Sequence, residues 1–435
     1  MYYGWLIVAA AFVMLFLSTG IGFYTFSVFL IPLERSFDAS RTAITGVNSV
    51  VAIMGGFAAP ATGALLHSLG PRIVIGGGAI LTGGAFLLLS KSTELWHLYV
   101  LGSFLGTGLS ATTLIPAQTL VANWFAKKRG TAMGITMMGV AVGGIVFSPL
   151  AHHLIETFDW RQTYVLFGLA IPVVIVPLAV LVIRRSPEEL GLQDADGAPD
   201  SEPLGLTVAE SLRTVSFWLL FSVQFFMTMA IAIVTAHIVG IVTASGFGTA
   251  VGDTTARLEG ARTTSYFLAA SIPGRILCGS LAERFSKRGV MAAAYVVLIA
   301  SGLTLMRLEG FGSLYAFVTL YGLGLGVVVV FPLLVADNFG LKAFGTLIGI
   351  MGVPFTLGAA LGVVSAAKLF DVSGSYSSVL SMQMSLFAIC AVLALLAKPP
   401  RKAADSDPGP GTPDRERTAI KTATAPAADA PAAPP

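Results

Sequence analysis

One arginine, Arg275, lies near the middle of a long apolar segment. That segment runs from Ser265 to Ala282 and holds no other charged residue. Burying a guanidinium in hydrocarbon costs at least ~2.5 kcal/mol on insertion scales. Because arginine keeps its proton in proteins, water, protein or an anion must solvate the charge. A guanidinium binds a carboxylate through two parallel hydrogen bonds, so Arg275 is a candidate site for a planar anion.

A structural role for Arg275 is the alternative to anion binding. The side chain could pair with an acidic residue, or with backbone carbonyls that Pro273 leaves free in its own helix. No predicted span carries an Asp or Glu at mid-depth, so an acidic partner is disfavoured. Ionisable residues inside membranes are functional more often than structural, and anion binding is therefore the favoured interpretation.

The composition indicates a membrane protein. Of the 435 residues, 55% are hydrophobic and 11% are charged, with a formal net charge of +3. That charge is too small to indicate a nucleic-acid partner. Apolar runs of 18 or more residues recur along the chain and predict membrane spans. No phosphate-binding loop, catalytic triad or zinc motif is visible, so neither an enzyme nor a cofactor or metal site is predicted.

Charged and turn-rich breaks divide the chain into twelve candidate transmembrane helices. Each is long enough to cross the bilayer, which predicts an all-α polytopic membrane protein with both termini on one side. The first apolar run is too long for a cleaved signal peptide and is predicted to be a retained span. The clustered bases between the spans predict that both termini lie in the cytoplasm. The protein is expected in the plasma (inner) membrane. The spans are expected at about 5–31, 42–66, 73–90, 96–122, 130–152, 163–183, 216–243, 261–282, 289–306, 312–336, 343–366 and 375–397.

An internal repeat divides these spans into two halves. Sliding the chain on itself by 215–216 residues aligns Gly63 with Gly279 and Gly130-Thr131 with Gly345-Thr346. Two six-helix units in parallel orientation form an architecture in which a ligand binds at mid-membrane between them. The predicted parts are an N-terminal bundle (1–183), a cytoplasmic linker (184–215), a C-terminal bundle (216–397) and a disordered cytoplasmic tail (398–435).

A polar motif recurs at one position in both halves, after the second and the eighth span. In the second half, a glycine precedes an acid and several bases at a helix end, where such charges can pair with a neighbouring helix terminus. Simple flanking charge would explain the bases, but not why the spacing recurs with the repeat. The residues predicted to form this gating contact between helices are Gly63, His67, Arg72, Gly279, Glu283, Arg284, Lys287 and Arg288.

These features resemble the major facilitator superfamily, whose loops after helices 2 and 8 carry this motif. Three further segments resemble bacterial relatives of the oxalate:formate antiporters and monocarboxylate porters. They are Tyr3-Gly4-Trp5, Gly274-Arg275-x-x-x-Gly279 and Pro187-Glu-Glu-Leu-Gly-Leu192. The resemblance implies the twelve-helix fold, with Arg275 receiving the substrate carboxylate.

The chain departs from the pattern of these families at three positions. His67 replaces the aspartate of the first-half loop, which is expected to weaken that contact or to make it pH-sensitive. Phe355 falls at or near the place of the oxalate carriers' second intramembrane base. Ser271 stands where animal monocarboxylate carriers have an aspartate, so the obvious proton carrier is missing.

Four further polar residues are candidates for substrate binding: Tyr24, Gln118, His237 and Tyr321. They lie in spans 1, 4, 7 and 10, which line the cavity in the resembled family. Each could instead hydrogen-bond a neighbouring helix, a contact worth about 0.6 kcal/mol on average. For any one of them the helix contact is the favoured interpretation, and His237 is the best remaining titratable group.

The predicted function is secondary active transport of small organic anions, most of all monocarboxylates, by alternating access. A proton or a counter-anion would be the coupling partner. The protein is expected to be a monomer in the lipid bilayer. A carrier of larger organic acids or drug-like anions is one alternative, and a transporter-like sensor without turnover is another. An anion channel would lack exchange kinetics.

The single mid-depth cation predicts a preference for monocarboxylates over dianions. One carboxylate neutralises Arg275, whereas a second would be unpaired at low dielectric and cost several kcal/mol. In vesicles at pH 7, lactate, pyruvate or formate should compete for uptake, and oxalate or succinate should compete weakly. Equal inhibition by oxalate and lactate would contradict this charge count.

Overall fold

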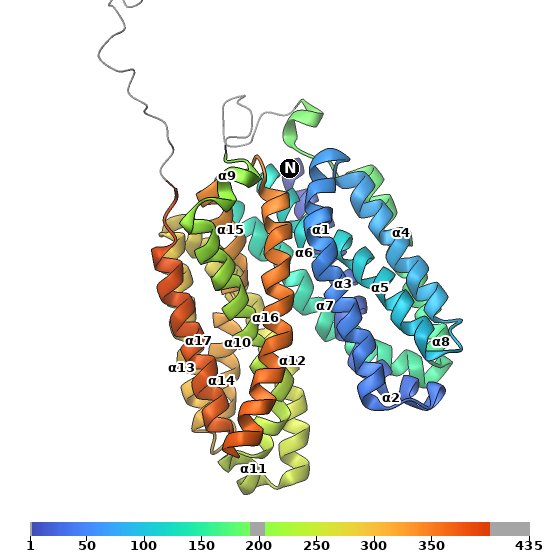
Figure 1. Ribbon diagram of the computed structural model, residues 1–435, viewed down its shortest axis with the longest axis vertical. Helices are drawn as coiled ribbons and strands as arrows, with labels where there is room; N and C mark the ends of the chain where they lie inside the picture. Colours follow the sequence, from blue (N-terminus) through green and yellow to red (C-terminus); the bar gives the residue numbers. More distant parts are fainter. Residues whose placement is uncertain (1, 192–204, 401–435) are drawn as a thin grey trace, which may run out of the picture. The chain divides into compact units, whose positions relative to one another are not determined.

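The computed structural model describes residues 2–191 and 205–400, which are almost entirely helical (Figure 1). The middle of the predicted linker (192–204) and nearly all of the predicted tail lie outside these residues. The elements are α1 (Tyr3–Thr19), η1 (Gly20–Tyr24), α2 (Phe26–Phe37), α3 (Arg41–Ser68), α4 (Pro71–Leu89), α5 (Leu95–Thr112), α6 (Leu114–Trp124), α7 (Arg129–Phe158), α8 (Trp160–Pro177), η2 (Leu178–Val182), η3 (Pro187–Leu190), α9 (Val208–Leu212), α10 (Val215–Thr243), α11 (Gly246–Val251), α12 (Asp253–Arg284), α13 (Lys287–Met306), α14 (Phe311–Gly324), α15 (Val327–Phe339), α16 (Phe344–Ser373) and α17 (Tyr376–Leu396).

Within the described residues, eleven helical stretches are long and apolar enough to cross a membrane. The remaining long helix, α12, has 32 residues and contains Arg275. Its first turns carry Asp253, Arg257, Glu259 and Arg262, which lower its mean hydropathy. The helix is long enough to keep these charges beyond the hydrocarbon while the remainder, residues 263–284, crosses it.

Several helices extend further than the sequence predicted. Helix α12 begins at Asp253 rather than near residue 261, and α7 continues to Phe158 rather than residue 152. Helix α16 continues to Ser373 and ends at Gly374, whose positive φ of 66° closes the last turn. The predicted ends were placed where hydropathy falls. Helical hydrogen bonding does not need an apolar environment, so the helices continue beyond the ends of the apolar segments.

Three of the spans are interrupted, which the sequence analysis did not predict. The first changes to a π-helix over Gly20–Tyr24 before α2 begins. The fourth breaks at Thr113, where the backbone leaves the helical region between α5 and α6. The tenth breaks between Gly324 and Val327. Broken helices at membrane depth occur where the backbone is buried in protein or lines a cavity.

The spans form two groups, one from each half of the repeat. Helices α1 and α3 to α8 pack together, as do α10 and α12 to α17. The most extensive contacts between the groups are α3 with α16 and α7 with α12, and these two crossings are equivalent under the repeat. Figure 1 shows the two groups side by side, with α9 at one end of the bundles and α11 at the other.

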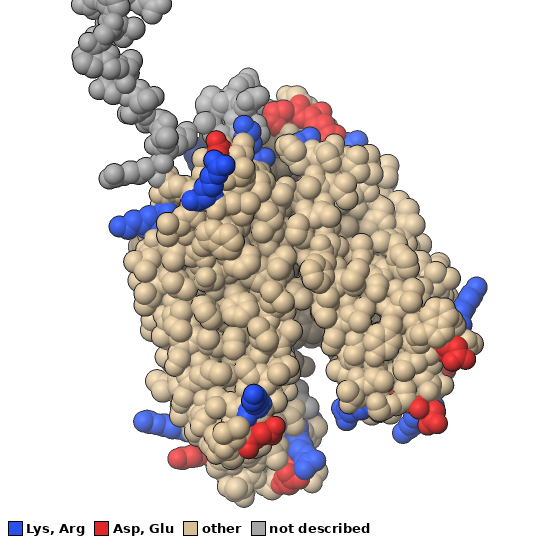
Figure 2. Space-filling model, in the orientation of Figure 1, with Lys and Arg blue, Asp and Glu red and all other residues tan. Residues whose placement is uncertain are grey.

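The two groups meet at one end and part at the other. The end where η3 and α9 lie is called the linker end, and the opposite end the cleft end. On the face shown in Figure 2, the groups are in contact towards the linker end and a cleft separates them at the cleft end. Charged side chains gather at both ends of that face, and a band without charge lies between them. This distribution matches a protein that crosses a bilayer.

Glycines allow the groups to meet at the linker end. Gly63 of α3 lies against the backbone of Gly345 in α16, and Gly279 of α12 lies against the backbone of Gly130 in α7. A Cβ atom at Gly63 or Gly279 would overlap the carbonyl of the facing glycine. Small residues at helix crossings let backbones approach closely in membranes. Closure of this end therefore depends on the absence of side chains at Gly63, Gly130 and Gly279.

Gly279→Val should open the linker end. The valine has no room against α7, and overpacking typically costs about 1–3 kcal/mol, which lowers the ratio of closed to open states about fivefold or more. Spin labels on cysteines at Ser68 and Lys342, one exposed residue on each group, would report the separation by pulsed electron paramagnetic resonance. Gly77→Val is the matched control, because nothing lies within 4 Å of a Cβ at Gly77. An unchanged distance in folded Gly279→Val protein would contradict the role of the crossing.

Candidate functional site

Helix α12 carries Arg275 into the contact between the two groups. The side chain is 6% exposed. Its Nη1 donates a hydrogen bond to the carbonyl oxygen of Met137 in α7, across the interface. Its Nε is buried and has no hydrogen-bond partner among the described residues. Part of the guanidinium is thus held by the opposite bundle, and part remains available to another acceptor.

The charge of Arg275 has no acidic partner in residues 2–191 and 205–400. The Met137 carbonyl is a neutral dipole, so it satisfies one donor without neutralising the charge. The acceptor belongs to α7 and is not a carbonyl that Pro273 frees within α12, which was the structural alternative. A buried charge in this state is well suited to an anion.

The equivalent crossing in the repeat packs without a guanidinium. An offset of 216 residues places Ala59 of α3 at the equivalent position, and Ala59 packs against Gly349 and Gly352 of α16. Those two glycines correspond to Gly134 and Met137 in α7, which Arg275 contacts. At one crossing a methyl group suffices, whereas at the other a guanidinium occupies the same place. The guanidinium therefore adds chemistry to a contact that the fold makes without it.

Tyr24 is the predicted site residue that the structure places near Arg275. It ends the π-helical turn of the first span, and its ring packs over Gly144 of α7. The Tyr24 carbonyl accepts a hydrogen bond of 3.3 Å from the Ser148 hydroxyl. The phenol and the guanidinium of Arg275 are close enough to interact electrostatically. Because Gly144 has no side chain, the tyrosine ring can lie flat against α7 at this depth.

The other three candidates are not brought to Arg275. Tyr321 is fully buried, and its hydroxyl lies 3.5 Å from the Ile231 carbonyl of α10. The Nε2 atom of His237 lies 3.3 Å from the Val363 carbonyl of α16. Both therefore make helix–helix contacts in this structure. Gln118 is buried in α6 on the linker-end side, and its amide has no hydrogen-bond partner in the part of the chain described.

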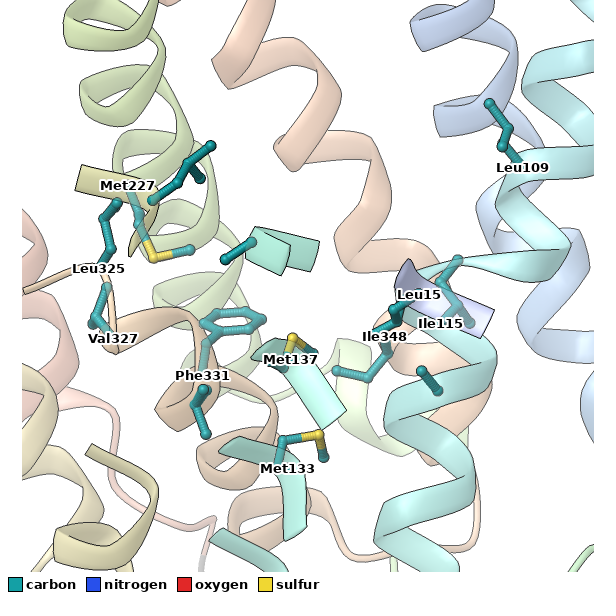
Figure 3. Packing of buried hydrophobic residues seen from close by; sticks show 14 of the residues in the cluster. Leu15, Leu109, Ile115, Met133, Met137, Met227, Leu325, Val327, Phe331 and Ile348 are labelled. Atoms are coloured by element: carbon teal, nitrogen blue, oxygen red, sulfur yellow. The ribbon is translucent and has the colours of Figure 1, made fainter. Parts of the chain in front are cut away.

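An apolar layer fills the centre of the molecule, where residues of both bundles meet (Figure 3). Its members are all less than a tenth exposed and include two methionines from α7, whose flexible side chains can fill irregular gaps. Sequence reasoning missed this layer, because apolar residues inside spans look alike whether they face lipid or the opposite bundle. The layer consists of Leu15, Ile115, Met133, Met137, Met227, Phe331 and Ile348.

The second-half polar motif forms a cap on a helix of the other bundle. The Glu283 carboxylate accepts a hydrogen bond of 2.6 Å from the backbone N–H of Thr131, in the first turn of α7. The first N–H groups of a helix lack partners within it, and the helix dipole favours negative charge there. Glu283 therefore joins the two bundles while the linker end is closed. This is the kind of contact that the sequence analysis expected of an acid in this motif.

The first-half motif contacts the start of the linker instead. A ring nitrogen of His67 lies 3.4 Å from a guanidinium nitrogen of Arg185. Arg72 forms an ion pair of 2.7 Å with Glu189, and its Nε donates to the Ile183 carbonyl. Among the described residues, the histidine that replaces an aspartate thus makes no hydrogen bond or ion pair with α16. The contacts of this motif therefore differ between the two halves, although the helices that carry it are equivalent under the repeat.

The remaining bases of the second-half motif differ in their contacts. Lys287 pairs with Asp337 at 2.5 Å within the same bundle. Arg284 and Arg288 form no hydrogen bond or ion pair with any residue that the structure describes. Of this motif, Gly279 and Glu283 therefore provide the contacts between the bundles.

The end of the linker lies against the C-terminal bundle. The backbone N–H of Leu206 donates a 2.8 Å hydrogen bond to the Phe339 carbonyl. In α9, hydrogen bonds from the backbone N–H and the hydroxyl of Thr207 hold the pKa of Glu210 below its usual value, and Lys342 contributes through its charge. The described ends of the linker thus contact one bundle each.

Glu283→Ala should weaken closure of the linker end. Losing a side-chain cap on a helix N-terminus typically costs about 1 kcal/mol, or about fivefold in the ratio of closed to open states. The same pair of spin labels would measure that ratio, and Glu283→Gln should have a smaller effect because it retains an acceptor. Arg284→Ala, the adjacent exposed charge without a contact, is the control. If the folded Glu283→Ala protein lost all substrate binding, a role confined to closure would be wrong.

Comparisons with known proteins agree with this architecture. A family model described as Major Facilitator Superfamily matches residues 11–334 and 254–430. Monocarboxylate transporter 13 of Rattus norvegicus is 32% identical over 165 residues, so the match spans only 38% of this chain and 38% of that protein. Monocarboxylate transporter 3 of Rattus norvegicus is 26% identical over 95% of this chain and 85% of its own length. The crystal structure of the human organic anion transporter MFSD10 (TETRAN) superposes with a TM-score of 0.69 at 16% identity, covering 90% of this chain and 99% of that one.

Proposed function

Since this chain belongs to the major facilitator superfamily, we propose that it is a secondary active transporter of small monocarboxylates. It is a multi-pass membrane protein, and its relatives include monocarboxylate transporters. We place it in the plasma (inner) membrane with both termini in the cytoplasm, so that the cleft opens to the outside. The substrate binds between the bundles, which then close around it from the other side.

The observation that supports this proposal is the state of Arg275. It is a buried guanidinium without an acidic partner among the described residues, it has a free Nε, and it lies where the two bundles cross. A monocarboxylate that enters from the cleft end can accept two hydrogen bonds from the fork and neutralise its charge. Tyr24, on the other bundle, interacts electrostatically with the guanidinium, and we assign its hydroxyl a supporting role in binding.

The hydrogen bond to Met137 gives a physical reason for coupling binding to movement. While Arg275 bonds the Met137 carbonyl, α12 and α7 are held together beneath the cleft. A carboxylate is a stronger acceptor for a guanidinium than a neutral carbonyl is. A substrate that takes over this donor removes one of the contacts that keep the linker end closed. Binding from the cleft end therefore favours the change that releases the substrate on the other side.

Exchange of one anion for another fits this site better than proton symport. Ser271, one turn before Arg275, donates its hydroxyl hydrogen bond to the Leu268 carbonyl. No acidic side chain lies beside the guanidinium in the residues described. Without a substrate, the charge of Arg275 stays uncompensated and bonded to α7, which disfavours movement of the empty carrier. A counter-anion would remove that barrier on the return step.

Arg275→Ala should abolish carboxylate uptake into proteoliposomes while the protein still folds. Losing one partner of a buried, hydrogen-bonded charge pair costs about 2 kcal/mol or more, so affinity should fall at least about thirtyfold. Arg275→Lys should also be poor, because a point charge replaces the bidentate fork. Arg257→Ala is the matched control, since Arg257 is an exposed residue of the same helix at the cleft end. Near wild-type uptake by Arg275→Ala would refute the site.

A further inference from the structure

Phe355 of α16 is a large aromatic residue on the side of its helix that faces the cleft. Helix α16 contacts α3 through Gly349 and Gly352, and contacts α10 through Gly358 and Gly362. At 100° per residue, Phe355 projects between these two directions, on the same side as Ile348 of the apolar layer. Leu357 and Leu361 project from the opposite side, which neither α3 nor α10 covers. Phe355 is 43% exposed, whereas Ile348 is 5% exposed.

The repeat gives the depth of Phe355 relative to Arg275. Arg275 corresponds to Ala59, and Ala59 packs against Gly352. Arg275 and Gly352 therefore lie at equivalent depths, and Phe355 follows Gly352 by three residues, about one helical turn towards the cleft end. Its exposure agrees with this order, because Ile348 lies two turns deeper, in the buried layer. Phe355 thus stands in the cleft wall just above the level of the guanidinium.

The N-terminal bundle has an apolar residue at the matching place. An offset of 215 residues pairs Phe355 with Val140 of α7, which is half-buried one turn from Gly144 and the ring of Tyr24. No span other than α12 carries a charged residue in its middle. A ligand held at Arg275 therefore meets one cation, one phenol and, beyond them, apolar walls.

We propose that Phe355 and Val140 form an apolar subsite that binds the hydrocarbon tail of the monocarboxylate. The inference rests on the proposed function and specifies its preferred substrate as an acid with an aliphatic or aromatic tail, over an acid of equal length whose tail is hydroxylated. The carboxylate occupies Arg275 at the base of the cleft, and the tail extends towards the cleft end. Removing the Phe355 ring and the tail from water together stabilises the complex in proportion to the apolar area buried.

The test uses the purified full-length protein in detergent and calorimetric titration with acetate, butyrate and hexanoate at pH 7.5, where these acids are ionised. Each methylene that enters an apolar site is expected to raise affinity about threefold to fourfold. In Phe355→Ser this dependence on chain length should become nearly flat, while Phe355→Leu should keep it. Leu357→Ser is the matched control, because Leu357 lies two residues away, is 51% exposed and points away from the cleft. A dihydroxylated butyrate should bind more weakly than butyrate does.

The outcomes separate this inference from the proposed function. Carboxylates that bind through Arg275 with no dependence on chain length would overturn the subsite and leave the transporter proposal intact. An equal effect of Phe355→Ser and Leu357→Ser would also overturn it. If Phe355 acts only as a gate, its substitution should change transport rates and leave the affinity series unchanged. Binding that Arg275→Ala does not reduce, or that hexanol reproduces, would refute the carboxylate site itself.

Discussion

A guanidinium charge buried where two helical bundles cross is the constraint on which the rest of this structure depends. Arg275 cannot lose its proton, and no acidic side chain among the described residues balances it. The Met137 carbonyl satisfies one of its donors from the opposite bundle. The charge is therefore tolerated only while the bundles are in contact or while an anion is bound. Under the proposed function, this charge couples anion binding to the arrangement of the bundles.

The repeat makes this connection asymmetric. Both crossings use close backbone contacts between glycines, so the two crossings close the linker end in the same way. The side chains differ: Ala59 is replaced by Arg275, and His67 by Glu283. The α7–α12 crossing therefore carries the polar contacts between bundles, whereas the equivalent first-half motif contacts the linker through His67 and Arg72. The α3–α16 crossing can act as a pivot whose contacts do not depend on a ligand.

Much of this arrangement could be predicted from the sequence, because it follows from hydropathy and from the repeat. The spans, the prominence of Arg275 and the acid in the second-half motif each depend on residues close together in the chain. Contacts made by backbone atoms could not be predicted: the Met137 carbonyl has no side-chain signal, and neither does the first turn of α7 that Glu283 caps. Polar residues such as Tyr321 and His237 show the same limit. A hydroxyl or imidazole in a span has the same sequence signature whether it faces a cavity or a neighbouring helix.

Opening the linker end requires several contacts to break together. The hydrogen bond from Arg275 to Met137 and the cap from Glu283 to Thr131 lie on the same pair of helices, and the apolar layer lies beside them. A hydrogen bond to a charged group contributes about 1.5–3 kcal/mol, and a helix cap about 1 kcal/mol. A carboxylate that accepts the Arg275 donor supplies the first of these contributions from the ligand, so the open state no longer has to leave a buried charge unpaired. Under the proposed function, the cap and the layer form again once the ligand has left, and a single arginine can then serve both binding and movement.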